Sequence, residues 1–148
     1  MGVKASMRPS TKAETVLFVD DETALLDAIA TVLRKEPYRV LKASSGAEAL
    51  AVLRSTPVDV VVSDERMACM RGTELLAKIR LEYPTIVRIM LTGEVSLATT
   101  AAAIEAGGLY RLLGKPLDPS DLKATLRQGL RMRELTLRAS TLCSAAAR

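Results

Sequence analysis

The chain contains 148 residues, 49% of them hydrophobic, and carries a formal net charge of +4. This length favours a single globular domain. Because the chain has no histidine, we exclude sites that need an imidazole base, a histidine metal ligand or an internal phosphohistidine. No apolar run approaches the roughly 18 residues of a membrane span, and no apolar secretory segment opens the sequence. We therefore expect a cytoplasmic protein without a membrane partner.

The positive charge is concentrated at the two ends of the chain. The first 12 residues and the last 30 together hold 9 of the 21 basic residues but only 2 of the 17 acidic ones, which leaves 12 basic and 15 acidic residues between them. We interpret residues 1–13 as a basic tail and residues 131–148 as a helical extension or linker stub. Solvated ends explain this charge more simply than nucleic-acid binding does.

Five apolar runs rich in β-favouring residues predict five strands. They are VLFV (16–19), YRVLKA (38–43), VDVVVS (58–63), IVRIML (86–91) and LYRLL (109–113). A helix is expected after each strand, and Asp118 and Pro119 are expected to begin the last one as N-cap and first helical residue. Strands that are nearly continuously apolar and alternate with helices predict an α/β fold, a doubly wound five-stranded parallel sheet.

Reactive side chains follow the predicted strands, where doubly wound sheets bind their ligands. They are Asp20, Asp21 and Glu22 after the first strand, Ser44 after the second, Asp64 after the third, Thr92 after the fourth and Lys115 after the fifth. Two carboxylates about 4 Å apart repel by roughly 4 kcal/mol at an effective dielectric near 20. A hard cation such as Mg²⁺ would offset that repulsion, so the sequence predicts a magnesium site.

Asp64 is distinguished from the other acids because it alone ends an interior apolar strand. A carboxylate anchored there can attack phosphorus and form an acyl phosphate. Mg²⁺ and the Lys115 ammonium can neutralise the phosphoryl oxygens, and Thr92 can supply a donor hydroxyl. An ionised carboxylate needs no general base, so the absence of histidine is no obstacle.

Four motifs at the strand ends resemble those of the receiver domain of two-component response regulators. They are FVDDE, SDERM, MLTG and LLGKP, and the resemblance covers roughly residues 14–130. It implies a flavodoxin-like (βα)5 fold with strand order 2-1-3-4-5 and a cis peptide at Lys115-Pro116. The stretch GGLYRLLGKP also looks like receivers attached to phosphohydrolase or hydrogenase-regulating output domains.

The resemblance implies a role for each site residue. Asp64 matches the phospho-acceptor, Asp21 a direct Mg²⁺ ligand, Asp20 a ligand acting through water, Arg66 a ligand through its backbone carbonyl, Thr92 the switching hydroxyl residue and Lys115 the phosphoryl-pairing lysine. The partners implied are a histidine kinase or phosphotransfer protein and an output partner. A homodimer through the fourth helix, fifth strand and fifth helix is a further expectation. Such a protein catalyses only its own phosphorylation and dephosphorylation.

The sequence departs from the family pattern around the site. Ala68 replaces the usual proline, Arg71 a frequent acid, and Leu112 the aromatic residue that moves inward with the threonine. Tyr110, expected on the same strand face as Leu112, is the candidate substitute.

Arg66 and Glu94 lie two residues beyond Asp64 and Thr92. We hypothesise that they pair across the site and slow hydrolysis of the acyl phosphate. The alternative is an exposed ion pair without kinetic effect.

A second function class also uses an aspartyl phosphate, the Mg²⁺-dependent phosphohydrolases of the haloacid dehalogenase type. These enzymes need two aspartates separated by one residue after the first strand. Here the spaced pair would be Asp20 and Glu22, and the chain has no room for a cap domain. The receiver interpretation is therefore the one that we adopt.

Overall fold

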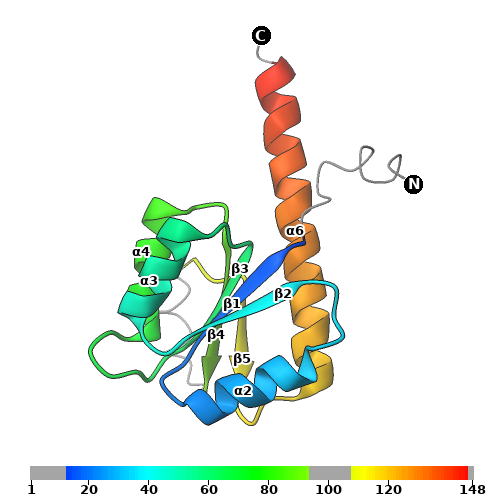
Figure 1. Cartoon of the computed structure of the whole chain (residues 1–148). Helices are drawn as coiled ribbons and strands as arrows, with labels where there is room; N and C mark the ends of the chain where they lie inside the picture. Colours follow the sequence, from blue (N-terminus) through cyan, green and yellow to red (C-terminus); the bar gives the residue numbers. More distant parts are fainter. Residues whose placement is uncertain (1–12, 94–107, 147–148) are drawn as a thin grey trace.

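The computed structural model describes residues 13–93 and 108–146, with side chains described up to residue 140. Figure 1 shows the chain with its helices and strands labelled. In chain order the elements are β1 (Thr15–Val19), α2 (Thr23–Val32), β2 (Arg39–Ala43), α3 (Gly46–Ser55), β3 (Val60–Asp64), α4 (Gly72–Glu82), β4 (Val87–Thr92), β5 (Arg111–Gly114) and α6 (Pro119–Ala146).

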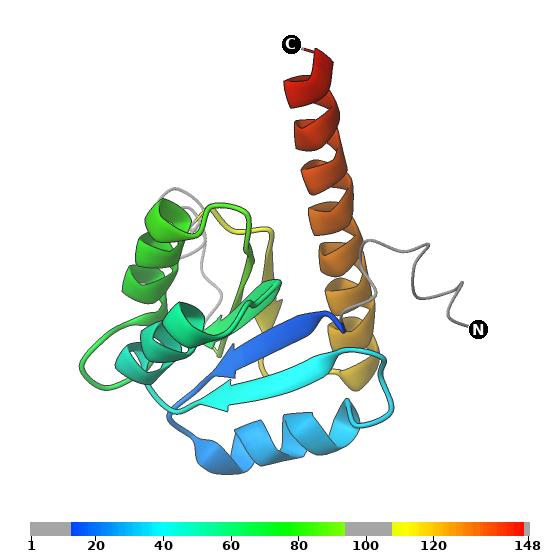
Figure 2. The same ribbon diagram turned by 45° about the horizontal axis from the view of Figure 1, so that its top comes forward.

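The five strands form one parallel sheet in the order β2-β1-β3-β4-β5, which confirms the predicted fold and strand order. Helices α3 and α4 cover one face, and α2 and α6 cover the other (Figures 1 and 2). β1 begins one residue earlier than predicted, and the other four strands begin one or two residues later, because apolar residues such as Val58 are buried before the strand ladder starts. The helix expected between β4 and β5 lies outside the described residues.

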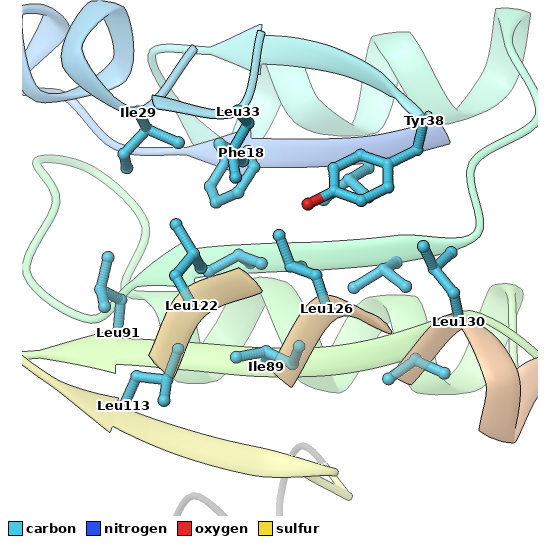
Figure 3. Packing of buried hydrophobic residues seen from close by; sticks show 14 of the residues in the cluster. Phe18, Ile29, Leu33, Tyr38, Ile89, Leu91, Leu113, Leu122, Leu126 and Leu130 are labelled. Carbon is cyan, nitrogen blue, oxygen red and sulfur yellow. The ribbon is translucent and has the colours of Figure 1, made fainter. Parts of the chain in front are cut away.

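Two apolar clusters, one on each face of the sheet, hold the layers together. The cluster under α2 and α6 contains Phe18, Ile29 and Leu126, which belong to the packed residues drawn in Figure 3. The cluster under α3 and α4 contains Leu17 and Leu76. Alternate residues of the central strands therefore serve opposite faces, as a sheet buried on both sides requires.

Side chains at the helix starts satisfy backbone donors that have no partner within the helix. The Ser45 hydroxyl accepts from the Glu48 N–H at 3.1 Å, and the Glu48 carboxylate accepts from the Ser44 N–H at 2.8 Å. Ser44 therefore belongs to the start of α3, and the structure does not bring it to the acidic site. The Asp118 carboxylate accepts from the Ser120 N–H at 3.1 Å, in line with its predicted role as N-cap of α6.

Helix α6 runs for 28 residues, and its C-terminal half projects past the amino ends of the strands (Figure 1). Arg133 fixes the helix where it leaves the sheet. Its guanidinium lies 2.6 Å from the Asp59 carboxylate, and its Nε–H donates to the Thr85 carbonyl at 3.1 Å. The other Asp59 oxygen accepts from the Thr15 N–H at 2.7 Å, so one ion pair ties α6 to the entrances of three strands. Among the described residues, no helix is long and apolar enough to cross a membrane.

We expect Arg133→Ala to lower the free energy of unfolding by about 2 kcal/mol, because it leaves Asp59 without its cation. This is less than for a fully buried pair, since the two side chains are 22% and 21% exposed. Urea unfolding would measure the loss. The control is Arg131→Ala, an exposed neighbour on the same helix, which should change stability by less than about 0.5 kcal/mol. Equal losses in the two variants would contradict the anchoring role.

Tyr38 contributes its ring to the cluster under α2 and α6 (Figure 3). The residue is only 6% exposed, and its hydroxyl has no hydrogen-bond partner among the described residues. Burial, and after it the charge of Glu36, raises the pKa of Tyr38 to about 12. The hydroxyl therefore costs stability even when it is neutral, and its ionisation costs more.

Tyr38→Phe should raise the free energy of unfolding by about 1 kcal/mol at neutral pH, because it removes a buried hydroxyl without a partner. The pKa of Tyr38 is higher in the folded protein than the value of about 10 in an unfolded chain. The folded protein therefore loses no stability through this group below about pH 10, and it loses stability progressively as the pH rises from there towards 12. Denaturation curves across this range should fall more steeply for the parent than for the variant; parallel curves would contradict this explanation.

Candidate functional site

The acidic residues gather at the carboxyl end of the sheet, where the strand order reverses between β1 and β3. This position is the ligand crevice of doubly wound folds. Asp20 and Asp21 follow β1, and Asp64 is the last residue of β3. One carboxylate oxygen from each lies within 4.8 Å of the others. The structure therefore brings together the three aspartates predicted to form the site.

Asp20 is buried and uses both carboxylate oxygens. One accepts from the Glu22 N–H at 2.9 Å, at the start of α2, and the other lies 3.3 Å from the Lys115 ammonium. Asp20 thus shapes the turn after β1 and also faces the site. The Glu22 side chain is exposed and is not part of the three-carboxylate cluster.

Lys115 reaches the acids from the loop after β5. Its ammonium lies 2.9 Å from the Asp64 carboxylate as well as 3.3 Å from that of Asp20. The loop is fixed by a hydrogen bond from the Lys115 N–H to the Thr92 carbonyl at 2.9 Å, and the Lys115-Pro116 peptide is cis as predicted. A single cation therefore links the ends of three strands.

The ionisation of the pair reflects burial and crowded charge. Burial raises the pKa of the Asp64 carboxyl, the charges of Asp20 and Asp21 raise it further, and the Lys115 hydrogen bond acts in the opposite direction. For Lys115, burial works to lower the pKa, but its contacts with Asp64 and Asp20 prevail and raise it. A cation added to this site would favour the ionised form of Asp64.

The residues present fit a divalent hard cation. Three carboxylates and one ammonium leave a net charge of −2, and all three acids offer oxygen atoms. Oxygen donors with room for several waters are what Mg²⁺ prefers. Asp21, Asp64 and Asp20 are the side chains that could hold such an ion.

Two open hollows flank Asp64. One, of about 480 Å³, is lined by Asp21 and Thr92 together with the loop between β3 and α4. The other, of about 300 Å³, is lined by Asp64, Lys115 and Gly93. Arg66 lines both hollows and so stands between the Asp21 side and the Lys115 side of the site. The Thr92 residue is buried at the end of β4.

Two residues that the sequence analysis did not single out shape the loop after Asp64. Gly72 packs against the Asp64 backbone, and a Cβ added there would lie 2.2 Å from the Asp64 carbonyl oxygen. The Glu65 carboxylate accepts from both the N–H and the hydroxyl of Thr73, at 2.8 and 2.6 Å. This contact spans the loop between β3 and α4, so no local sequence pattern indicates it.

The prediction that Tyr110 shares a strand face with Leu112 is wrong. Leu112 packs with the cluster under α3 and α4, whereas the Tyr110 ring packs with the opposite cluster, beside Gly129 of α6. The reason is that Tyr110 lies in a bend before β5, so the alternation of strand faces starts only at Arg111. Glu94, the expected partner of Arg66, lies outside the described residues.

A family model described as response regulator receiver domain matches residues 16–127. The hydrogenase transcriptional regulatory protein HoxA of Cupriavidus necator is 40% identical over 121 residues, which are 82% of this chain and 25% of that protein. The transcriptional regulatory protein GlrR of Escherichia coli K12 is 38% identical over 121 residues, which are 82% of this chain and 27% of that protein. This chain spans about a quarter of the length of these relatives.

Among solved structures, the signal receiver domain of an HD domain-containing protein from Pseudomonas fluorescens Pf-5 is similar throughout. It is 36% identical, has a TM-score of 0.80, and the match covers 83% of this chain and 98% of that one. The family match extends over most of the chain and agrees with the acidic crevice at the reversal of strand order. This chain therefore belongs to the response regulator receiver domain family of two-component signalling.

Proposed function

We propose that this receiver accepts a phosphoryl group on Asp64 from a partner histidine kinase or phosphotransfer protein, with Mg²⁺ at the acidic site. One observation carries the proposal. The Asp64 carboxylate lies 2.9 Å from the Lys115 ammonium, within 4.8 Å of two further carboxylates, at the edge of an open hollow. An anchored nucleophile, a fixed cation and an approach for the donor are what phosphoryl transfer needs.

In the proposed reaction, an Asp64 carboxylate oxygen attacks the phosphorus of a phosphohistidine on the partner. A P–O bond forms as the P–N bond breaks, and the electron pair of the broken bond leaves with the imidazole nitrogen. The product is an acyl phosphate on Asp64. Since these 148 residues contain no histidine, the donor imidazole lies outside them.

Lys115 and Thr92 stabilise the transferred group from the two adjoining strand ends. The Lys115 ammonium neutralises one phosphoryl oxygen while it stays hydrogen-bonded within the site. The Thr92 hydroxyl donates to another oxygen and thereby senses the phosphoryl group. In the family pattern an aromatic side chain moves inward together with the threonine. Leu112 takes its place here, on the face of β5 that α3 and α4 cover, so the conformational change after phosphorylation would involve no aromatic ring at this position.

Mg²⁺ would be held by Asp21 and Asp64 directly, by Asp20 through water and by the Arg66 backbone carbonyl. Such an ion withdraws charge from the phosphoryl oxygens and offsets the repulsion among the carboxylates. Asp20 is also paired with Lys115, so this carboxylate would serve both the lysine and the metal-binding residues.

A phosphohydrolase is not favoured by the arrangement of the acids. That alternative requires Asp20 and Glu22 as its catalytic pair, but Glu22 is exposed and stands outside the cluster. The cluster instead joins the ends of two different strands, as a receiver requires.

The phosphorylated state would be passed to an output partner through a protein contact in the cytoplasm. Relatives of this chain are named as transcriptional regulators, and the matched residues are only 25–27% of their length, so a transcriptional output domain is the proposed destination. Helix α6 leads from the site side of the sheet to the opposite edge and is a direct route to such a domain (Figure 2). A homodimer through the segment between β4 and β5, together with β5 and α6, would be an additional contact.

Incubation with a small-molecule phosphodonor and Mg²⁺ should add one acid-labile phosphoryl group to the parent and none to Asp64→Asn. The reason is that an amide oxygen is not a nucleophile towards phosphorus under these conditions. Intact-mass measurement would distinguish the two forms. Asp27→Asn, which removes an exposed carboxylate on α2, should be phosphorylated like the parent.

Omitting Mg²⁺ or adding a chelator should slow phosphorylation of the parent strongly. Phosphorylation of Asp64→Asn to the same extent as the parent would overturn the assignment of the acceptor. Repeated turnover of a generic phosphate ester would overturn the receiver function in favour of a hydrolase.

A further inference from the structure

We propose that Glu65 is a positioning residue, which holds the loop of residues 65–72 closed so that the loop can complete the Mg²⁺ site. We call this segment the acceptor loop. The inference rests on the proposed function, because it assigns to Glu65 a part in the same metal-dependent phosphorylation. Glu65 follows the acceptor aspartate directly, and its carboxylate is hydrogen-bonded to Thr73 at the start of α4.

The two ends of the acceptor loop are joined by contacts of Glu65. Its backbone carbonyl accepts from the Gly72 N–H at 3.1 Å. One carboxylate oxygen accepts from the Thr73 N–H at 2.8 Å and from the Thr73 hydroxyl at 2.6 Å. The side chain is only 14% exposed, so these hydrogen bonds to a carboxylate are largely shielded from water.

Glu65 supplies the helix cap that the sequence omits at its usual place. Arg71 is the N-cap residue of α4, but a guanidinium has no acceptor atom and cannot bind the free N–H groups of the first turn. The Glu65 carboxylate, six residues before Arg71, accepts a hydrogen bond from a free N–H of the first turn instead. Its negative charge also interacts favourably with the positive end of the helix dipole. The Arg71 guanidinium, 4.0 Å from Glu65, contributes a weaker charge contact.

The acceptor loop lacks one usual backbone restraint and contains one unfavourable backbone conformation. It has Ala68 where a proline would restrict the backbone, and Cys69 adopts a φ of 68°, a region that costs an L-residue about 1–2 kcal/mol. The absence of a side chain at Gly72 allows the loop end to contact the Asp64 carbonyl. Closure by Glu65 keeps this strained segment in one arrangement.

The closed loop faces the acidic site. The Ala68 N–H donates to the Asp21 carboxylate at 3.3 Å, and Met70 packs against Gly46 at the start of α3. The loop also carries Arg66, whose backbone carbonyl is the proposed third protein ligand. A change at Glu65 therefore reaches the metal through the orientation of Asp21 and Arg66, with no direct contact of Glu65 to the ion.

Calorimetric titration of the full chain with Mg²⁺ tests this role. Glu65→Ala should raise the Mg²⁺ dissociation constant about tenfold, as changes to residues that orient metal ligands commonly do. Phosphorylation by a small-molecule donor should need more Mg²⁺ but reach nearly the parental rate at saturation. Faster hydrogen exchange of the Ala68 amide should accompany the loss of affinity.

Glu74→Ala is the matched control, because Glu74 is an exposed acid in the same turn that accepts from the Arg71 N–H at 3.0 Å. The Glu74 side chain does not join the two ends of the acceptor loop. Its removal should therefore weaken the start of α4 but leave the Mg²⁺ affinity unchanged. The double variant Glu65→Ala/Arg71→Asp restores an acidic cap and should recover much of the lost affinity.

An unchanged dissociation constant in folded Glu65→Ala, or equal losses in Glu65→Ala and Glu74→Ala, would overturn the positioning role while the proposed function stands. Failure of the parent to bind Mg²⁺ would overturn the proposed function, and the positioning role with it.

Discussion

The structure depends on the crowding of three carboxylates at the tips of two neighbouring strands. Asp20, Asp21 and Asp64 place oxygen atoms within 4.8 Å of one another, and two of the three residues are buried. At such distances each pair repels by several kcal/mol if nothing compensates it. The Lys115 ammonium neutralises part of this charge, and the remaining negative charge is what a divalent cation could compensate. Function is therefore obtained at a cost in stability to the isolated fold.

The surrounding architecture keeps the acids together against this repulsion. The parallel order of β2, β1 and β3 sets the two strand tips side by side, and apolar clusters on both faces prevent the strands from moving apart. The loop after β5 brings the cation, and the loop after β3 is closed by its own acid at position 65. At the far edge, the pair of Arg133 and Asp59 fixes α6 to the strand entrances. The molecule thus has an electrostatically strained end and a firmly anchored one.

Most of the fold and the centre of the site could be predicted from the sequence. Apolar strands that alternate with helices have few alternative arrangements, and the carboxyl ends of parallel strands must meet, so Asp20, Asp64 and Lys115 could be grouped. The Tyr110 prediction failed because strand alternation was extended through a bend that only the backbone reveals. Glu65 was missed because its contact with Thr73 spans a loop, and no local pattern states which acid caps a helix that begins with arginine.

The most direct test of this account is the effect of Mg²⁺ on the stability of the parent and of Asp21→Asn, measured by urea unfolding. Without Mg²⁺, the variant should be more stable than the parent, because one repelling charge is gone. Mg²⁺ at 100 times its dissociation constant should stabilise the parent by about 2.7 kcal/mol and reverse the order of the two proteins. A parent that gains no stability from Mg²⁺, together with a variant that is no more stable without it, would contradict the claim that a cation compensates crowded carboxylates.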